Sequence, residues 1–271
     1  MMRGINPSTN KNPMNPSPIW MLASLLLLIV ACQRQMQVAD AGVERAAAES
    51  TRVLSRGVIS GHVTLTGTPR PARIVRTPPD LQKTCGEVVV DQSPRLFRGG
   101  AIADVVVYLE DGPTLSKEGG TGKRPLTIID QTKCMFTPPV VADYAGDAVE
   151  ILNSDPLLHN VRANRDSQVL FNFAMPVQGM RSRRQLPSQP GIVRLHCDVH
   201  PWMHAAIRTF DHPYFGISDE SGAFQLPNVP SGRHKLVFWH PHLAERKVDV
   251  QLGDSPAILD QSWPADELTS E

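Results

Sequence analysis

The sequence has no apolar run long enough to cross a membrane and few signatures of an enzyme. Its longest apolar stretch, residues 19–31, has thirteen residues, whereas a transmembrane helix needs about 20. Paired catalytic carboxylates, a nucleophile elbow and a phosphate-binding loop do not stand out anywhere. These absences argue against an integral membrane protein and give no support to a hydrolase.

An excess of positive charge is also missing, and so is helical periodicity. The 271 residues contain 27 Lys+Arg and 27 Asp+Glu, without a basic stripe, which excludes a nucleic-acid-binding protein. No long pattern with a period of 3.6 residues follows the N-terminal region, and 24 prolines disfavour helices. Short β-branched runs separated by Gly, Pro, Asn and Asp instead predict an all-β sandwich.

Side chains that can bind a metal are concentrated in one short segment near the middle of the chain. Cys197, His200 and Met203 are spaced three residues apart, and the pair His159–Asn160 lies about forty residues upstream. Two imidazoles, a thiolate and a thioether form the donor set of a blue-copper site. We therefore predict one type 1 copper ion with His159, Cys197, His200 and Met203 as ligands.

Other metal centres fit this segment less well. Attachment of a c-type haem needs Cys-x-x-Cys-His, and no second cysteine lies near Cys197. A structural zinc site is normally closed by four Cys or His ligands, and Met203 is a poor substitute for one of them.

The segment resembles the cupredoxins, and most closely the amicyanin type, in which a His-Asn pair and a short Cys-x-x-His-x-x-Met loop supply the ligands. The resemblance covers roughly residues 130–210. It implies a cupredoxin-like Greek-key β-sandwich at 124–210, in which Asn160 braces the cysteine loop by hydrogen bonding. We also expect Pro201 and Trp202 to surround the solvent-facing edge of His200 with an apolar patch that suits a transient redox partner. The alternative is that Trp202 packs inward as part of the core.

A second resemblance concerns the segments on either side. Residues 57–63 and 218–236 resemble the opening strand and closing hairpin of carboxypeptidase regulatory-like (transthyretin-like) domains. The expectation is a discontinuous sandwich built from 56–112 and 211–253, with 57–66 paired to 235–239 and a tail at 254–271. The alternative is one elongated cupredoxin with additions at both ends.

The start of the chain predicts export. Residues 19–31 fit the apolar core of a signal peptide, and their end at Cys32 resembles a bacterial lipoprotein signal (residues 1–32), although an ordinary signal peptide with a chance cysteine is the alternative. Residues 33–55 would then be a tether. The resemblance implies a lipid anchor at Cys32 in the periplasm, and Gln33 after it favours the outer membrane.

The four cysteines fit this location. If Cys32 carries lipid and Cys197 binds copper, Cys85 and Cys134 remain. They form a disulfide candidate, as the periplasm allows, and two separate buried thiols are the alternative.

The leading functional hypothesis is a membrane-anchored electron carrier, and not an enzyme, that exchanges single electrons with a dehydrogenase or cytochrome. Four protein ligands leave no open position for a substrate. Copper binding or delivery without redox turnover is one alternative. A β-sandwich scaffold that binds polysaccharide or protein is another.

Overall fold

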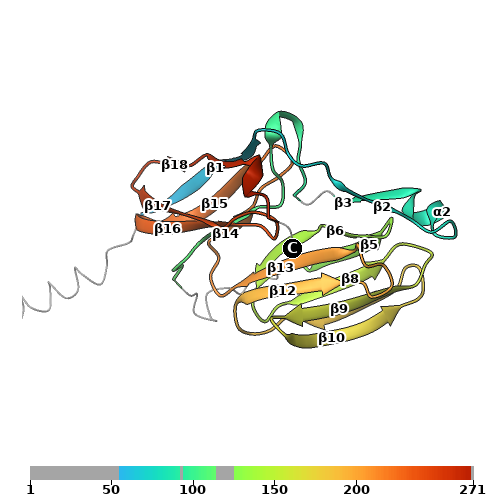
Figure 1. The fold of residues 1–271 in the computed structure, drawn as a ribbon. Helices are drawn as coiled ribbons and strands as arrows, with labels where there is room; N and C mark the ends of the chain where they lie inside the picture. Colours follow the sequence, from blue (N-terminus) through green and yellow to red (C-terminus); the bar gives the residue numbers. More distant parts are fainter. Residues whose placement is uncertain (1–54, 92–93, 114–124, 270–271) are drawn as a thin grey trace, which may run out of the picture. The chain divides into compact units, whose positions relative to one another are not determined.

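The computed structural model describes residues 55–91, 94–113 and 125–269. This part of the chain is almost entirely β, which confirms the all-β expectation (Figure 1). The helical elements are α2 (Gln82–Cys85) and the 3₁₀ turns η1 (Arg98–Gly100) and η2 (Ala265–Glu267). The strands, in chain order, are β1 (Arg56–Thr66), β2 (Arg73–Arg76), β3 (Val88–Asp91), β4 (Val106–Leu109), β5 (Thr127–Thr132), β6 (Met135–Thr137), β7 (Val140–Tyr144), β8 (Ala148–Asn153), β9 (His159–Arg165), β10 (Gln168–Met175), β11 (Arg181–Gln185), β12 (Gly191–His196), β13 (His204–Phe210), β14 (Phe215–Ile217), β15 (Ala223–Pro230), β16 (Gly232–Trp239), β17 (Arg246–Leu252), β18 (Ala257–Ile258) and β19 (Gln261–Pro264).

The predicted lipoprotein signal with Cys32, and the predicted tether up to residue 54, lie outside the described residues. Within the described part of the chain, no helix is both long and apolar enough to cross a membrane.

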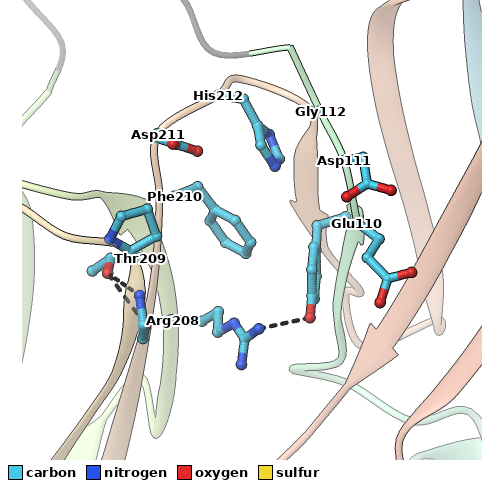
Figure 2. Close-up of a pocket in the computed structure, with 11 residues that line it drawn as sticks. Glu110, Asp111, Gly112, Arg208, Thr209, Phe210, Asp211 and His212 are labelled. Carbon is cyan, nitrogen blue, oxygen red and sulfur yellow. Dashed lines mark hydrogen bonds between the residues drawn. The ribbon is translucent and has the colours of Figure 1, made fainter.

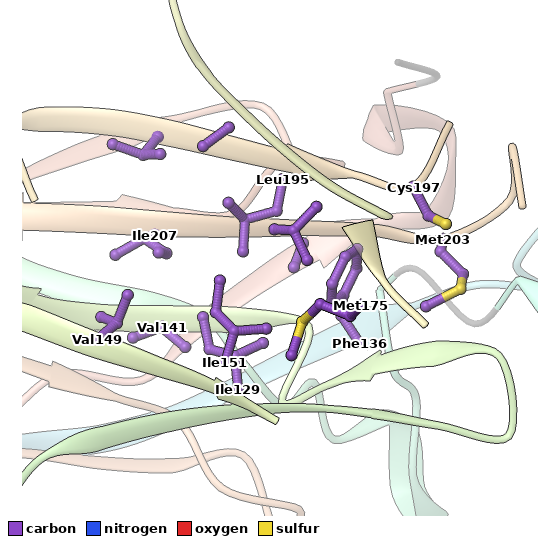
Figure 3. Close-up of a cluster of buried hydrophobic side chains, with 14 of the residues drawn as sticks. Ile129, Phe136, Val141, Val149, Ile151, Met175, Leu195, Cys197, Met203 and Ile207 are labelled. Atoms are coloured by element: carbon purple, nitrogen blue, oxygen red, sulfur yellow. The ribbon is translucent and has the colours of Figure 1, made fainter. Parts of the chain in front are cut away.

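The first sandwich uses the middle of the chain, from β5 to β13. One sheet has the order β10–β9–β12–β13–β7 and the other β11–β8–β5–β6. In β8, fully buried residues alternate with partly exposed ones, which is the pattern of a strand with one face on a core. The inward side chains of both sheets form one apolar core, and Cys197 and Met203 lie at one end of it (Figure 3).

The second sandwich is assembled from strands that precede and follow the first. Its sheets have the orders β15–β1–β18, with β19 also paired to β1, and β14–β4–β16–β17. A separate core of buried side chains fills the space between these sheets. Strands β1 and β4 come before residue 127, and β14–β19 come after residue 210.

The partner of the first strand differs from the prediction. β1 pairs antiparallel with β15, whereas β16, which contains residues 235–239, pairs with β4 and β17 in the other sheet. Hydrophobic pattern marks each of these segments as a strand, but it does not determine which of two consecutive strands lies beside β1.

The predicted tail at 254–271 is also corrected. β18 and β19 run parallel to β1 and extend its sheet. Trp263 of β19 is fully buried, packs edge-on against Phe238, and donates its indole N–H to the Ala244 carbonyl at 2.9 Å. The sequence around Trp263 lacks a long alternating run, so only the tertiary packing reveals these strands.

One part of the predicted segment 56–112 belongs elsewhere. β2 and β3 form a two-stranded ribbon, and α2 lies between them. Cys85 at the end of α2 is bonded to Cys134 with their Cα atoms 5.1 Å apart. Cys85 and Val89 are therefore part of the core of the first sandwich.

A third, smaller apolar cluster contains residues of both sandwiches: Val106, Tyr108, Val140, Ala206, Phe210, Val237 and Trp239. Beside it, Arg208 of β13 donates from Nη2 to the hydroxyl of Tyr108 at 2.7 Å (Figure 2). Charged groups such as Glu110, Asp111 and Asp211 line the pocket at this place. The pocket shares no residue with the predicted metal ligands.

Candidate metal centre

The four predicted ligands come from strand ends and from the β12–β13 loop, at one end of the first sandwich. His159 is the first residue of β9, Cys197 directly follows β12, and Met203 directly precedes β13. All four ligands, including His200, are buried, with exposed fractions of 2% or less. Because β9, β12 and β13 are neighbours in one sheet, the strand pairing itself brings these side chains together.

The loop between β12 and β13 is closed by its own backbone. The Cys197 N–H donates to the Met203 carbonyl at 3.2 Å, and the Met203 N–H donates to the His200 carbonyl at 2.9 Å. Three potential ligands are therefore held on one tight loop with few degrees of freedom.

Three of the four donor atoms converge on one point. The Nδ1 atoms of His159 and His200 are 3.0 Å apart, and the Cys197 sulfur lies 3.7 Å from Nδ1 of His200. The potential ligand atoms of His159, Cys197 and His200 all lie within 4.8 Å of one another. Two imidazole nitrogens at this separation can share one ion at the usual metal–nitrogen distance of about 2.0 Å. In Figure 3 the Met203 side chain lies beside Cys197.

The two other clusters of potential ligands in the described residues include Cys85 or Cys134. Both of these sulfurs are in the disulfide, so neither is free to bind a metal. The residues present thus fit a copper ion at one place: a soft thiolate, a thioether and two imidazoles, which suit both Cu(I) and Cu(II).

Sequence reasoning missed Asp155. Its Oδ2 atom accepts the Nε2–H of His159 at 2.9 Å and the Cys134 N–H at 2.8 Å, and its Oδ1 atom accepts the Lys133 N–H at 2.8 Å. Asp155 is only 4% exposed. A carboxylate that holds Nε2 of a histidine leaves Nδ1 to face the metal. The available signal was an acidic residue four positions before His159, although such a spacing is common in loops.

Asn160 links the two ligand-bearing segments. Its Oδ1 accepts the Asp198 N–H at 3.0 Å, and its Nδ2 donates to the Phe173 carbonyl at 3.4 Å. Its backbone N–H points at the Cys197 sulfur at 3.4 Å. The side chain therefore connects β9 to the cysteine loop.

The electrostatics favour a thiolate at the centre. Burial raises the pKa of the Cys197 thiol, but hydrogen bonds from His159, His200 and the Asn160 N–H outweigh it and lower the pKa to about 6. Burial lowers the pKa of His159, but hydrogen bonds to Asp155 and Cys197 raise it to about 9. The two shifts share a cause, because the Cys197 sulfur and the His159 ring each stabilise the charged form of the other.

The predicted patch at Pro201 and Trp202 requires correction. His200 does not present a solvent-facing edge, because it is only 1% exposed. Trp202 is half-buried, with its ring centroid 5.3 Å from that of His200, and its indole N–H donates to the Cys134 carbonyl at 3.1 Å. Pro201 is exposed. The difference arises because the segment containing Cys85 packs at this position, which no local pattern predicts.

His196 and His204 take no part in the centre. They flank the loop, their rings lie 6.0 Å apart, and His196 Nε2 lies 2.6 Å from the side-chain amide of Asn164. Neither is among the groups of converging ligands, as expected for His196 from the alternation along β12.

No protein-family model matches the sequence, and no curated protein matches it. Solved structures do match in part. A Cu-containing nitrite reductase from Thermus scotoductus SA-01 is 22% identical over 36% of this chain, with a TM-score of 0.29, and the match covers 25% of the reductase. A purple cupredoxin from Nitrosopumilus maritimus is 19% identical over 31% of this chain and 99% of its own, with a TM-score of 0.27.

A variant of amicyanin in its reduced state is 17% identical over 38% of this chain and 98% of its own, with a TM-score of 0.29. This chain spans about a quarter of the length of the nitrite reductase, and the two smaller proteins are covered almost entirely. The functional assignment of this chain rests on its own donor set, in which His159, Cys197 and His200 converge.

Proposed function

We propose that the centre binds one copper ion as a type 1 site and that the protein carries single electrons between redox partners. The observation that carries the proposal is the convergence of His159 Nδ1, His200 Nδ1 and the Cys197 sulfur in a buried place beside Met203. Copper would supply a one-electron couple there. The donor set suits both oxidation states, so little rearrangement accompanies the transfer.

The surrounding residues support transfer of electrons over conversion of a substrate. Four protein donors would leave no coordination position open to a substrate, and these four side chains are buried. Asp155 orients His159, Asn160 braces the cysteine loop, and the lowered pKa of Cys197 supplies the thiolate that ligation requires. The fold therefore prepares the ligand geometry before any metal arrives.

Apolar side chains beside the ligands suit a transient redox partner such as a dehydrogenase or cytochrome. Leu158, directly before His159, is 47% exposed, and Val199, directly before His200, is 46% exposed. Pro201, directly after His200, is exposed as well. Weak electron-transfer complexes use small interfaces, for which such exposed apolar side chains are suited.

The location is proposed as the periplasm, with a lipid on Cys32 and the outer membrane as the site of anchoring. The Cys85–Cys134 disulfide supports an oxidising compartment. Labelling of the expressed protein with a radioactive fatty acid, and its loss in Cys32→Ser, tests the anchor separately from the metal.

The first experiment is a visible absorption spectrum after addition of Cu(II). We expect a strong charge-transfer band in the native protein that is lost in Cys197→Ser and His159→Ala and retained in the matched control His204→Ala. A pale spectrum in the native protein, typical of nitrogen and oxygen ligation, would overturn the type 1 assignment. If the band is present, slow electron self-exchange would favour copper delivery over electron transport.

A further inference from the structure

His200 is buried although its neighbours in the loop are not. Its exposed fraction is 1%, compared with 46% for Val199, and Pro201 is exposed. Three groups of the first sandwich lie against this imidazole: the His159 ring, the Cys197 sulfur and the Trp202 ring. A further group against it, the Cys85–Cys134 disulfide, ties in a distant part of the chain.

Cys85 belongs to the segment 73–91, which we call the cover segment. The sulfurs of Cys85 and Cys134 lie within 4.8 Å of a ring nitrogen of His200. Leu81 packs against the core of the first sandwich, and Val89 is 5% exposed within it. The cover segment is thus fastened by one covalent bond and by apolar side chains on either side of that bond.

The attachment point on the sandwich is a strained turn. Lys133 and Cys134 connect β5 to β6 and have φ values of +51° and +57°, a conformation that usually selects Asn-Gly in such two-residue hairpins. The carboxylate of Asp155 accepts both backbone N–H groups, at 2.8 Å each. This turn is therefore held in place by the same carboxylate that orients His159.

Trp202 completes the enclosure. Its ring lies beside that of His200, and its indole N–H donates to the carbonyl of Cys134. The turn at Lys133 and Cys134 thus makes three kinds of contact. The Cys134 sulfur bonds to the cover segment, the Cys134 carbonyl accepts the Trp202 indole N–H, and the two backbone N–H groups donate to Asp155. Both imidazole ligands are connected to this turn.

We propose that the cover segment, held by the Cys85–Cys134 bond, is a built-in shield that controls access to His200. Reagents and partner proteins then do not reach this ligand directly, and electron exchange on this side proceeds across the cover segment. The shielding of His200 stands on the metal-free geometry, whereas its effect on electron exchange rests on the proposed function.

The test of shielding uses the metal-free protein. Acylation of histidines by diethyl pyrocarbonate, located by fragment mass spectrometry, is expected to be at least tenfold slower at His200 than at the exposed His62. In the double variant Cys85→Ser with Cys134→Ser, His200 is expected to react at least tenfold faster than in the native protein. Lys83→Ala, an exposed change within the cover segment, is the matched control and should leave the rate unchanged.

A second variant guards against loss of folding in the first. Leu81→Ser with Val89→Ser keeps the disulfide and removes the apolar contacts on both sides of it, so His200 should again react faster while circular dichroism stays native. Equal reaction of His200 and His62 in the native protein would overturn the proposal. The proposal would also be overturned if a variant is folded and its cover segment exchanges amide hydrogens faster than in the native protein, while His200 is still acylated at the native rate.

The copper-loaded protein provides the second arm. If the blue band is present, oxidation of the reduced form by hexacyanoferrate should be about tenfold faster in the variants than in the native protein. An absent band would refute the proposed function and leave the acylation result intact. A native band with identical oxidation rates would refute control of electron exchange by the cover segment.

Discussion

The carboxylate of Asp155 lies 2.9 Å from Nε2 of His159 and leaves the opposite ring nitrogen facing His200. One buried side chain thereby fixes the ring orientation of a proposed metal ligand. Groups of this kind that hold a metal-bound histidine commonly contribute a factor of about 10–100 to metal affinity.

Replacing Asp155 by Asn should therefore weaken copper binding by about 10–100-fold, because the amide is a poorer acceptor and carries no charge. Competition with a chelator of known affinity measures the change. Asp198→Asn serves as the control, because it changes a half-exposed carboxylate in the loop between Cys197 and His200. Equal affinities of Asp155→Asn and the native protein would show that the contact does not act on the metal.

Cys197 should be a thiolate in the metal-free protein at neutral pH. Its pKa of about 6 lies below the ordinary value of 9, so stability gained from the thiolate is present above pH 9 and is lost as the pH falls through about 6. The far-ultraviolet absorbance of the thiolate should rise with a midpoint near pH 6. His159→Gln should move this midpoint toward 9, and a midpoint already near 9 in the native protein would contradict the prediction.

The side chain of Asn160 should contribute to the stability of the metal-free fold. Asn160→Ala removes the acceptor of the Asp198 N–H, and loss of such a hydrogen bond costs about 1 kcal/mol of the free energy of unfolding. Urea denaturation measures the difference. Asn160→Asp keeps an oxygen at the same position and should lose less, so an equal loss in both variants would point to another cause.

The C-terminal strand should be indispensable to the second sandwich. Trp263→Ala empties a fully buried position between Phe238 and Arg246 and should lower the free energy of unfolding by about 3–5 kcal/mol. Ile258→Ala, at a side chain that is 75% exposed, should change it by less than about 0.5 kcal/mol. Similar melting curves for the two variants would contradict the packing described for β19.

Acid should destabilise the second sandwich through His240. Burial, followed by the charges of His242 and Arg95, lowers the pKa of His240 to about 3. The unfolded chain takes up this proton below pH 6.5, so the stability contributed by neutral His240 is complete above pH 6.5 and is lost as the pH falls toward 3. Between pH 6.5 and 5 the loss is about 2 kcal/mol.

His240→Asn should flatten this pH dependence, because an amide oxygen can still accept the His242 N–H that Nδ1 accepts now, at 3.1 Å. Denaturant midpoints at pH 5 and pH 7 measure the effect. His62→Asn changes an exposed histidine on β1 and should leave the native pH dependence in place. A steep acid loss that persists in His240→Asn would assign the dependence to other groups.

The candidate ligands could be found from the sequence because three of them lie on one short loop. Cys197, His200 and Met203 are adjacent in the chain, so their spacing alone places them together, and a strand pattern precedes them. His159 was found because its neighbour Asn160 repeats a family pair. The all-β class followed from short β-branched runs, which act locally.

What escaped prediction depends on contacts between distant segments. Asp155 also accepts a hydrogen bond from the distant turn at Cys134, and Cys85 reaches His200 from another part of the chain. Trp263 lies in a segment with polar neighbours and becomes a core residue only through β1. None of these relationships leaves a periodic signal in the sequence.

The pairing of β1 with β15 also has a consequence for how the chain matures. His62 pairs with Ala223 and Arg56 with Pro230, so the second sandwich cannot close until most of the polypeptide has been synthesised. Strands β5–β13 of the first sandwich are complete earlier, and domains generally fold as units in the order of synthesis. If the first sandwich folds first, it brings β4 and β14, the strands on either side of it in the sequence, close together. The entropic cost of closing the second sandwich is then reduced.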